Sequence, residues 1–413
     1  MQNKLRNPLR KWLAPAFLTG AALTLAVPAE ALLIMERDGT EFHMEVHTVG
    51  RLQALDHDAD SKAAAGFAKQ DVNPGFQHAI GNLGWRLVMQ DYVDVFFDVT
   101  IASRVKADSM WGHQGYMLIK QVPEASPLSG ANVFFDHFDV KAGQFIADFG
   151  NEVHRRSLNA DVQSNPLVGN PVVSPHATEV AVEVIHNNPA GFGAMVGMGS
   201  GVATESLGSG SRPSFRAKAW TDIPGANGLE LAGSFYRVNH GDAIVRGSNL
   251  FRTERLGGQY SGIWDDGNAP GQVMIGDGTS VTAWQLDATW SADDRTTLWG
   301  HVGRASDDRG ATEEAWYYYG VTGQYYAIQD TVYLAARYSA ADASRFQSDR
   351  SNDGSIQRWQ VGGGLWILPE MLLLKVEYVN QWTRGFHSGA LSGVQLNQDP
   401  KFEGIIAEVS FSF

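Results

Sequence analysis

The sequence predicts an all-β fold, a transmembrane antiparallel β-barrel, from three observations. Apolar and polar residues alternate along many segments, short and long connections alternate between those segments, and an export signal precedes them. No later apolar stretch reaches the roughly 20 residues that a spanning helix needs. Strands that cross a membrane must close into a barrel, because lipid offers the backbone no hydrogen-bond partners.

The first 31 residues form the predicted signal peptide. Four basic residues lie within the first eleven, and an apolar run extends from Leu13 to Val27. The small residues of Pro28–Ala31 supply a cleavage site after Ala31. An uncleaved anchor helix is the alternative, but the apolar run is too short to span a bilayer. Residues 32–413 are then one barrel domain, exported to the outer membrane of a Gram-negative bacterium.

Composition excludes several classes of function. The chain has no cysteine, so disulfides, zinc–thiolate sites and thiol nucleophiles are excluded. Loss of the signal peptide, with four basic residues and Glu30, changes the formal charge from −13 to −16. This acidic balance disfavours nucleic-acid binding. We expect no metal and no cofactor.

The final segment, residues 401–413, shows the alternation most clearly. Apolar side chains fall on one face and mostly polar or small ones on the other: Phe413, Phe411, Val409, Ala407 and Ile405 against Ser412, Ser410, Glu408 and Gly404. One face would meet hydrocarbon and the other water. A terminal Phe that closes such a strand resembles the assembly signal of bacterial outer-membrane proteins.

The same alternation predicts about sixteen strands, with both termini on the periplasmic side. Their ranges are 41–55, 79–90, 93–103, 112–121, 138–147, 177–187, 192–202, 213–222, 229–239, 281–290, 296–304, 315–326, 331–339, 357–367, 371–382 and 401–413. The connection 240–280 is long enough for a further hairpin near 249–263, so eighteen strands is the alternative. Aromatic residues near strand ends are predicted on the outer face, where interfacial girdles form: Trp85, Trp284, Trp290, Trp366, Tyr378 and Trp382.

The connections predict which end of the barrel is which. Short links fall at 90–92, 187–191, 223–228, 291–295, 328–330 and 368–370, and long polar links at 56–77, 148–176, 240–280, 305–314, 340–356 and 383–400. Short links are typical of periplasmic turns and long ones of extracellular loops. A barrel of sixteen strands is too wide for side chains to fill, so it leaves an aqueous lumen unless something plugs it.

One stretch resembles a known family. The run from Phe138 to Glu152, with Gly143-Gln144-Phe145 leading into Phe149-Gly150, resembles the fifth strand and loop entry of gram-negative porins, and is closest to the phosphate-selective porin family and its relatives. The segments 377–381 and 402–413 are similar to the same broad group. The resemblance implies a passive-diffusion channel whose third loop, residues 148–176, folds inward as a constriction. It also leaves open a homotrimer or a monomer, since subunit-facing and lipid-facing strands share one pattern.

Charged residues supply candidates for that constriction. The third loop contributes Asp148, Glu152, Arg155, Arg156 and Asp161. Inward-facing strand positions contribute basic residues to the wall: Arg51, Arg86, Lys141, Arg216, Lys218 and Arg337. Carboxylates opposite guanidinium groups across a narrow opening would make a transverse field that favours small polar solutes.

Phosphate selectivity does not fit this composition. A phosphate pore needs basic residues stacked along its path, whereas the exported chain has eight widely spaced lysines, at positions 62, 69, 106, 120, 141, 218, 375 and 401. With a formal charge of −16, a weakly cation-preferring or nearly neutral pore fits better.

Other functions fit the sequence less well than a channel. The spacing of Asp56, Asp58 and Asp60 could hold Ca²⁺, but the EF-hand pattern fails after it, so a solvated loop is preferred. No G-x-S-x-G motif has a credible context, and we expect no enzyme. The alternative class is a barrel with a structural or adhesive role, or with an enzyme at its rim. Expected partners are outer-membrane lipid, lipopolysaccharide, and small hydrophilic solutes or ions.

Overall fold

The computed structural model describes residues 32–57, 75–76, 79–102, 110–155, 162–169, 172–173, 178–188, 191–201, 213–226, 228–239, 280–308, 313–346, 354–384 and 401–413. The predicted signal peptide and most of the long connections lie outside these residues. Within the described ranges, no helix is long and apolar enough to cross a membrane.

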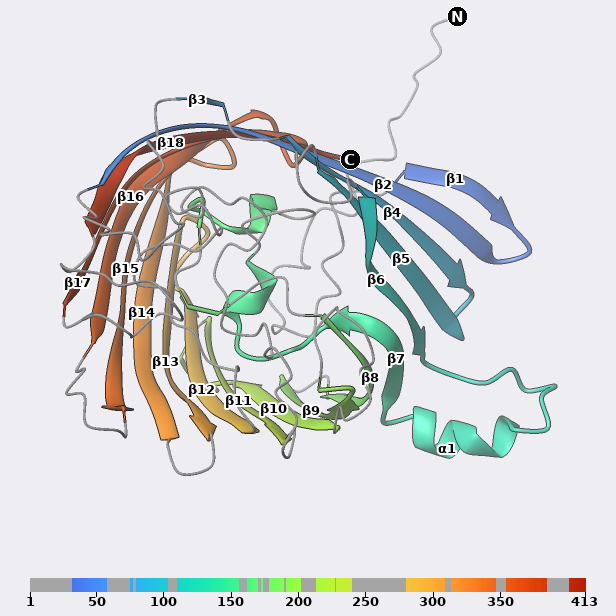
Figure 1. Ribbon diagram of the computed structural model, residues 1–413. Coiled ribbons are helices and arrows are strands. Elements are labelled where there is room, and N and C mark those ends of the chain that lie inside the picture. The colour runs from blue at the N-terminus through green and yellow to red at the C-terminus, as the bar shows by residue number, and fades with distance from the viewer. Residues whose placement is uncertain are drawn as a thin grey trace, which may run out of the picture.

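Sixteen antiparallel strands form a closed barrel (Figure 1). They are β2 (Thr40–His57), β4 (Ile80–Met89), β5 (Val93–Ala102), β6 (Met110–Ile119), β7 (Asp139–Ile146), β8 (Thr178–Asn188), β9 (Phe192–Gly199), β10 (Ser214–Asp222), β11 (Leu229–Asn239), β12 (Ser280–Ser291), β13 (Thr296–Asp308), β14 (Glu313–Ile328), β15 (Val332–Phe346), β16 (Ser355–Leu368), β17 (Leu372–Arg384) and β18 (Lys401–Ser412). The strand ranges predicted from alternation are confirmed to within a few residues, except that β9 ends earlier and β13 and β15 extend further at their loop ends.

The barrel closes where β18 pairs with β2, a pairing that we call the seam. At one end of the seam, Val46 and Phe413 exchange two backbone hydrogen bonds of 2.8 and 3.0 Å. The alternative of eighteen barrel strands is wrong, because β11 pairs directly with β12 from Leu229 to Asn239. The candidate hairpin near 249–263 lies outside the described residues.

Alternate residues face outward and inward, as the sequence pattern predicts. On β14, Val321 is 53% exposed on the outer face, whereas its neighbour Thr322 is 3% exposed on the inner face. Five of the six predicted girdle aromatics share the outward phase of their strands. The wall therefore has an apolar outer surface and an inner surface that carries most of the polar side chains.

Trp366 corrects one prediction. Its strand places it on the inner face, in phase with Arg358 and Gln360, rather than in the outer girdle. There it packs against the buried cluster of Leu167, Tyr333, Ala335 and Leu373. This is the regular alternation of β16, because the pairing with β17 becomes irregular only beyond Trp366.

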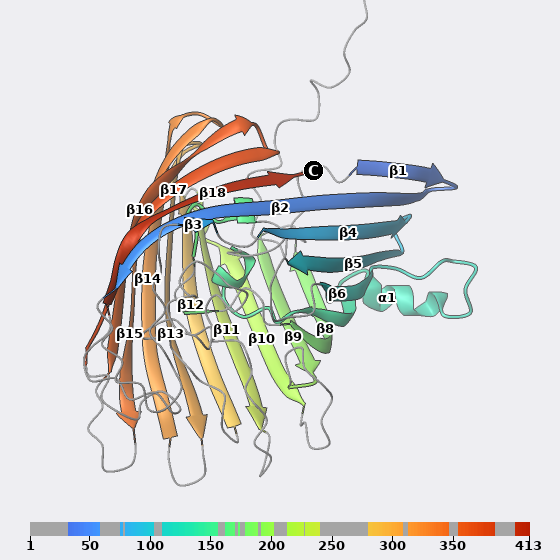
Figure 2. The same ribbon diagram turned by 45° about the horizontal axis from the view of Figure 1, so that its top comes forward.

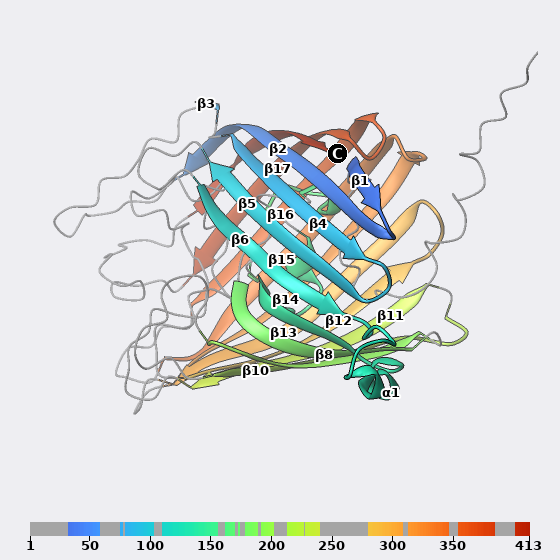
Figure 3. The same ribbon diagram turned by 90° about the vertical axis from the view of Figure 1, so that its right-hand side faces the viewer.

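Two short strands and a short helix lie beside the barrel. β1 (Leu32–Arg37) forms a hairpin with the start of β2, through Asp38 and Gly39 at φ values of 54° and 75°. β3 (Gly75–Phe76) pairs with β2. The helix α1 (Asn132–Phe135) interrupts the link between β6 and β7, and projects outside the barrel at the end that carries the short turns (Figures 2 and 3). Sequence alternation predicted neither β1 nor α1, because each is too short to show a period.

The third loop connects β7 to β8 and runs inside the barrel, where it forms the short helices η3 (Glu152–His154) and η4 (Val162–Ser164) (Figure 1). This inward path confirms the predicted loop placement. Apolar loop residues join wall residues in one buried cluster that includes Phe149, Val153, Val168, Val172, Tyr236, Val281, Trp316, Tyr318 and Phe402. Burial of these side chains supplies a hydrophobic contribution to the inward fold of the loop.

The outer surface gives a test of the membrane placement. Val321→Arg, at the middle of β14, should destabilise the inserted barrel by about 2–4 kcal/mol, because a charge there meets the bilayer centre. Ile328→Arg, at the turn end of the same strand, should cost about 0–1 kcal/mol, because the side chain reaches the interface. Urea unfolding in lipid vesicles measures both, and equal costs at the two positions would contradict the placement.

Candidate channel constriction

The loop enters the barrel through Phe149 and Gly150. Gly150 has a φ of +71°, and a Cβ added there would lie 2.2 Å from Nε2 of Gln285 on the wall. Only glycine lets the backbone pass so close in this conformation. The Gly150 N–H donates to Oγ of Ser234 at 3.0 Å, so the wall replaces the hydrogen bond that the strand no longer provides.

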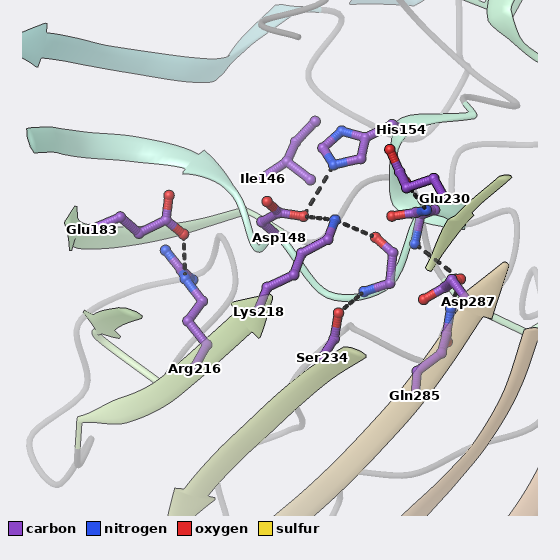
Figure 4. Close-up of polar contacts among 12 residues, drawn as sticks. Ile146, Asp148, His154, Glu183, Arg216, Lys218, Glu230, Ser234, Gln285 and Asp287 are labelled. Carbon is purple, nitrogen blue, oxygen red and sulfur yellow. Dashed lines mark hydrogen bonds and ion pairs between the residues drawn. The ribbon is translucent and has the colours of Figure 1, made fainter. Parts of the chain in front are cut away.

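Asp148 ties this entry to the wall (Figure 4). Its carboxylate accepts hydrogen bonds from Nζ of Lys218 at 2.8 Å and from Nε2 of His154 at 3.0 Å. Burial alone would raise the pKa of Asp148, but Lys218 and His154 together lower that pKa well below its usual range. Lys218 also donates to the Gly150 carbonyl at 3.2 Å, so one ammonium holds two points of the loop.

The next turn of the loop meets β11, β12 and β13. The Asn151 N–H donates to Oδ1 of Asp287 at 3.2 Å, and the Asn151 side chain donates to Glu230 at 3.4 Å (Figure 4). These two carboxylates come from neighbouring strands of the wall. The first segment of the loop is therefore held along a continuous arc from β10 to β13.

Glu152 and Arg155 pair within the loop. Nη1 of Arg155 lies 2.6 Å from Oε1 of Glu152, and the guanidinium stacks 4.2 Å from the centre of the Trp299 ring. Nδ1 of His301 lies 3.8 Å from the same carboxylate oxygen. Although burial raises the pKa of Glu152, the Arg155 charge and the His301 contact lower it well below its usual range. Both loop charges are thus committed to contacts near the wall.

A second loop segment, residues 162–169, is held by the next arc of the wall, from β15 to β17, which only β14 separates from the first arc. Arg337 of β15 donates to the Gly169 carbonyl at 2.5 Å and to Oδ1 of Asn165 at 3.0 Å. Nζ of Lys375 on β17 donates to three backbone carbonyls of the same segment, and Glu377 accepts the Val168 N–H at 2.6 Å. The wall therefore binds the backbone of this segment more than its side chains.

The structure places the predicted residues in different surroundings. Lys218 and Arg337 contact the loop directly, whereas Arg51 and Arg86 pair with the wall carboxylates Glu408 and Asp94. Nζ of Lys141 lies 4.3 Å from the ring centres of both Tyr116 and Phe145. Arg156 and Asp161 lie outside the described residues. The predicted assignment of these charges to a constriction stays a prediction.

Arg216 shows why register matters for such assignments. It pairs with Glu183 at 2.6 Å and with Glu179 at 3.3 Å, although both carboxylates lie two strands away on β8. Gly197 of β9 lies directly opposite both Arg216 and Glu183, and a Cβ there would meet the Glu183 side chain at 2.7 Å. The glycine thus leaves the space in which the two side chains meet.

Sequence reasoning missed several residues that hold the loop: Ser234, Glu230, Asp287, Gln360, Lys375 and Glu377. Alternation gave Lys375 and Glu377 the inward phase, and that was the available signal. An inward residue contacts the loop only if its strand lies on the part of the barrel that the loop passes. The alternation pattern of one sequence does not give this position.

Among the described residues, no group of three or more His, Asp or Glu side chains could hold a metal ion. The acidic run that begins at Asp56 cannot be placed, because residues 58–60 lie outside the described ranges. The Ca²⁺ alternative therefore stays untested.

Comparison with solved structures supports the fold. The chain is similar to the trimer form of OmpT, an outer-membrane protein of Vibrio cholerae (11% identity, 91% of this chain and 100% of that chain, TM-score 0.52). It is also similar to an anion-selective porin from Comamonas acidovorans (8% identity, 91% and 100%, TM-score 0.57) and to OprB of Pseudomonas putida (12% identity, 91% and 94%, TM-score 0.53).

No family model matches the chain, and no curated protein matches it. The chain therefore shares its fold with solved outer-membrane porins. The resemblance to phosphate-selective porins in particular is not confirmed. At identities this low, the likeness is one of architecture.

The Asp148–Lys218 pair gives one prediction. Lys218→Met should lower the free energy of unfolding by about 3 kcal/mol, because it leaves a buried carboxylate without its ammonium partner. Urea unfolding in detergent micelles measures this loss. The double variant Asp148→Asn/Lys218→Met should recover part of it, since neither charge is then left alone. Stability equal to wild type in the single variant would show that the pair is absent.

The lowered pKa of Asp148 predicts how stability depends on pH. A carboxyl whose folded pKa is lowered adds stability above its unfolded pKa of about 4, and loses that contribution as pH falls further. The stability gap between wild type and Asp148→Asn should stay constant from about pH 7 to about pH 5, then narrow below about pH 4. Urea unfolding across that range measures the gap. A gap that closes near pH 6.5, the usual pKa of histidine, would instead implicate His154.

Proposed function

We propose that the chain forms a water-filled channel for passive diffusion of small hydrophilic solutes and ions across an outer membrane. The observation that carries this proposal is the third loop, held inside a sixteen-strand barrel by two neighbouring arcs of wall, β10–β13 and β15–β17. A barrel of this size is too wide for its own side chains to fill. A loop fixed in the interior then narrows the path without having to move for each solute.

The charges inside the barrel bear on which solutes pass. The wall cations Lys218, Arg216 and Arg51 each pair with a carboxylate, and Arg337 binds loop carbonyls. Cations that are already neutralised attract passing anions only weakly. We therefore propose a nearly neutral or weakly cation-preferring channel, and the phosphate-selective assignment loses its physical basis.

The location and assembly belong to the same proposal. Export by the signal peptide would deliver the chain to the outer membrane of a Gram-negative bacterium, with the short turns in the periplasm and the outer face against lipid and lipopolysaccharide. The similarity to a trimer form of an outer-membrane protein supports a homotrimer. The proposal is of a channel rather than an enzyme, since the loop contacts described above serve to hold the loop.

Purified protein in planar bilayers should show stepwise, ohmic channels in KCl. The current should be ohmic because the aqueous path beside a fixed loop is open at all times. Liposome swelling with small sugars should show the same path, with slower entry as the sugar grows. A complete lack of conductance and of swelling in correctly folded protein would contradict the proposal, and would favour the structural or adhesive alternative.

Reversal potential in a KCl gradient tests the charge preference. We expect a small potential of the sign that reports cation preference, or a value near zero, because the wall cations Lys218, Arg216 and Arg51 are paired with carboxylates. Phosphate added on one side should not block the current. A strong anion preference would contradict the neutralised wall while leaving the channel itself intact.

A further inference from the structure

Three buried charged residues lie directly opposite one another on consecutive strands. Arg51 of β2 faces Glu408 of β18, and Glu408 faces Lys375 of β17. Nε of Arg51 donates to one Glu408 oxygen at 2.7 Å, and Nζ of Lys375 lies 2.6 Å from the other. We call this set the seam ladder, because it crosses the pairing that closes the barrel.

Lys375 extends the seam ladder to the third loop. Its ammonium donates to the carbonyls of Val162 at 2.9 Å, Asn165 at 3.1 Å and Leu167 at 3.3 Å. Lys375 is 1% exposed, so water does not replace these partners. A buried ammonium is tolerated only when a carboxylate balances its charge and acceptors take its N–H groups. Glu408 supplies the charge balance here, and the loop supplies the acceptors.

The closure of the seam and the hold on the loop depend on each other through Glu408 and Lys375. Without Glu408, the ammonium would lose the carboxylate that balances it, and its position against the loop would no longer be fixed. Without closure of the seam, Arg51 would not lie beside Glu408. Of the described contacts that Glu408 makes, its link to the loop runs through Lys375.

We propose that the seam ladder is the positioning device of the constriction: the closed seam fixes Glu408, Glu408 fixes the Lys375 ammonium, and that ammonium fixes loop residues 162–167. Lys375 is a positioning residue in this account, since it sets the place of the loop. The inference deepens the proposed function, because a fixed loop matters most if the barrel conducts. Its test, however, does not require conduction.

Loop mobility is the direct readout. The chain has no native cysteine, so Ser164→Cys, an exposed position beside the held carbonyls, accepts a single nitroxide label. Electron paramagnetic resonance of that label in lipid vesicles reports its rotational freedom. We expect restricted motion in the otherwise unchanged protein, and a several-fold shorter rotational correlation time after Lys375→Met.

Glu408→Gln separates the seam ladder from a purely local role for Lys375. It removes no described contact with the loop, yet it should free the label as Lys375→Met does. The matched control is Ser412→Ala, which removes a side-chain hydrogen bond to His47 across the same seam but outside the ladder. Ser412→Ala and the charge-conserving Lys375→Arg should leave the label restricted. Resistance of each barrel to SDS at room temperature confirms folding.

The outcomes are distinct. Freed labels in Lys375→Met and Glu408→Gln, with restricted labels in both controls, support the seam ladder even if no current is ever measured. A label that stays restricted in folded Lys375→Met overturns the proposal, and so does one freed equally by Ser412→Ala. If Lys375→Met does not fold, Lys375→Gln and Glu408→Gln carry the same test. Ohmic channels combined with an unchanged label in these variants would keep the channel and reject the ladder.

Discussion

Hydrocarbon offers no partner to a backbone N–H or C=O, so every strand that crosses a membrane has to be paired along both edges. In this chain the requirement brings together β2 and β18, which lie more than 340 residues apart in sequence, and aligns them until Val46 and Phe413 exchange backbone hydrogen bonds. The same closure fixes the number of strands at sixteen and leaves an interior too wide for wall side chains alone.

Buried charged side chains of the wall hold the third loop in the interior of the barrel. Lys218 holds Asp148 and the Gly150 carbonyl, while Lys375 holds three further loop carbonyls. A buried cation without such partners would be costly, and so would a loop carbonyl that faced an apolar wall. The loop and the wall thus satisfy each other, and apolar burial around Phe149 and Val168 adds to the same arrangement. This mutual dependence explains how a long connection can stay inside the barrel.

Much of the fold could be read from the sequence, because strand alternation has a period of two residues and survives along most of the barrel strands. The contacts could not. Asp148 and Lys218 were both identified, but as charges facing each other across an opening, whereas they lie 2.8 Å apart. The pairing of Arg216 with Glu183 depends on a glycine in the strand between them. Such features arise from register and barrel curvature, which alternation alone does not specify.

The central claim is that the third loop narrows a conducting path. Covalent modification of Ser164→Cys with a bulky, charged, membrane-impermeant thiosulfonate, during single-channel recording, tests it most directly. The wild-type chain has no cysteine and serves as the unreactive control. We predict a stepwise fall in current as each thiol reacts. An unchanged current after modification, verified by the mass of the protein, would contradict the claim that this loop lies in the path of the permeating ions.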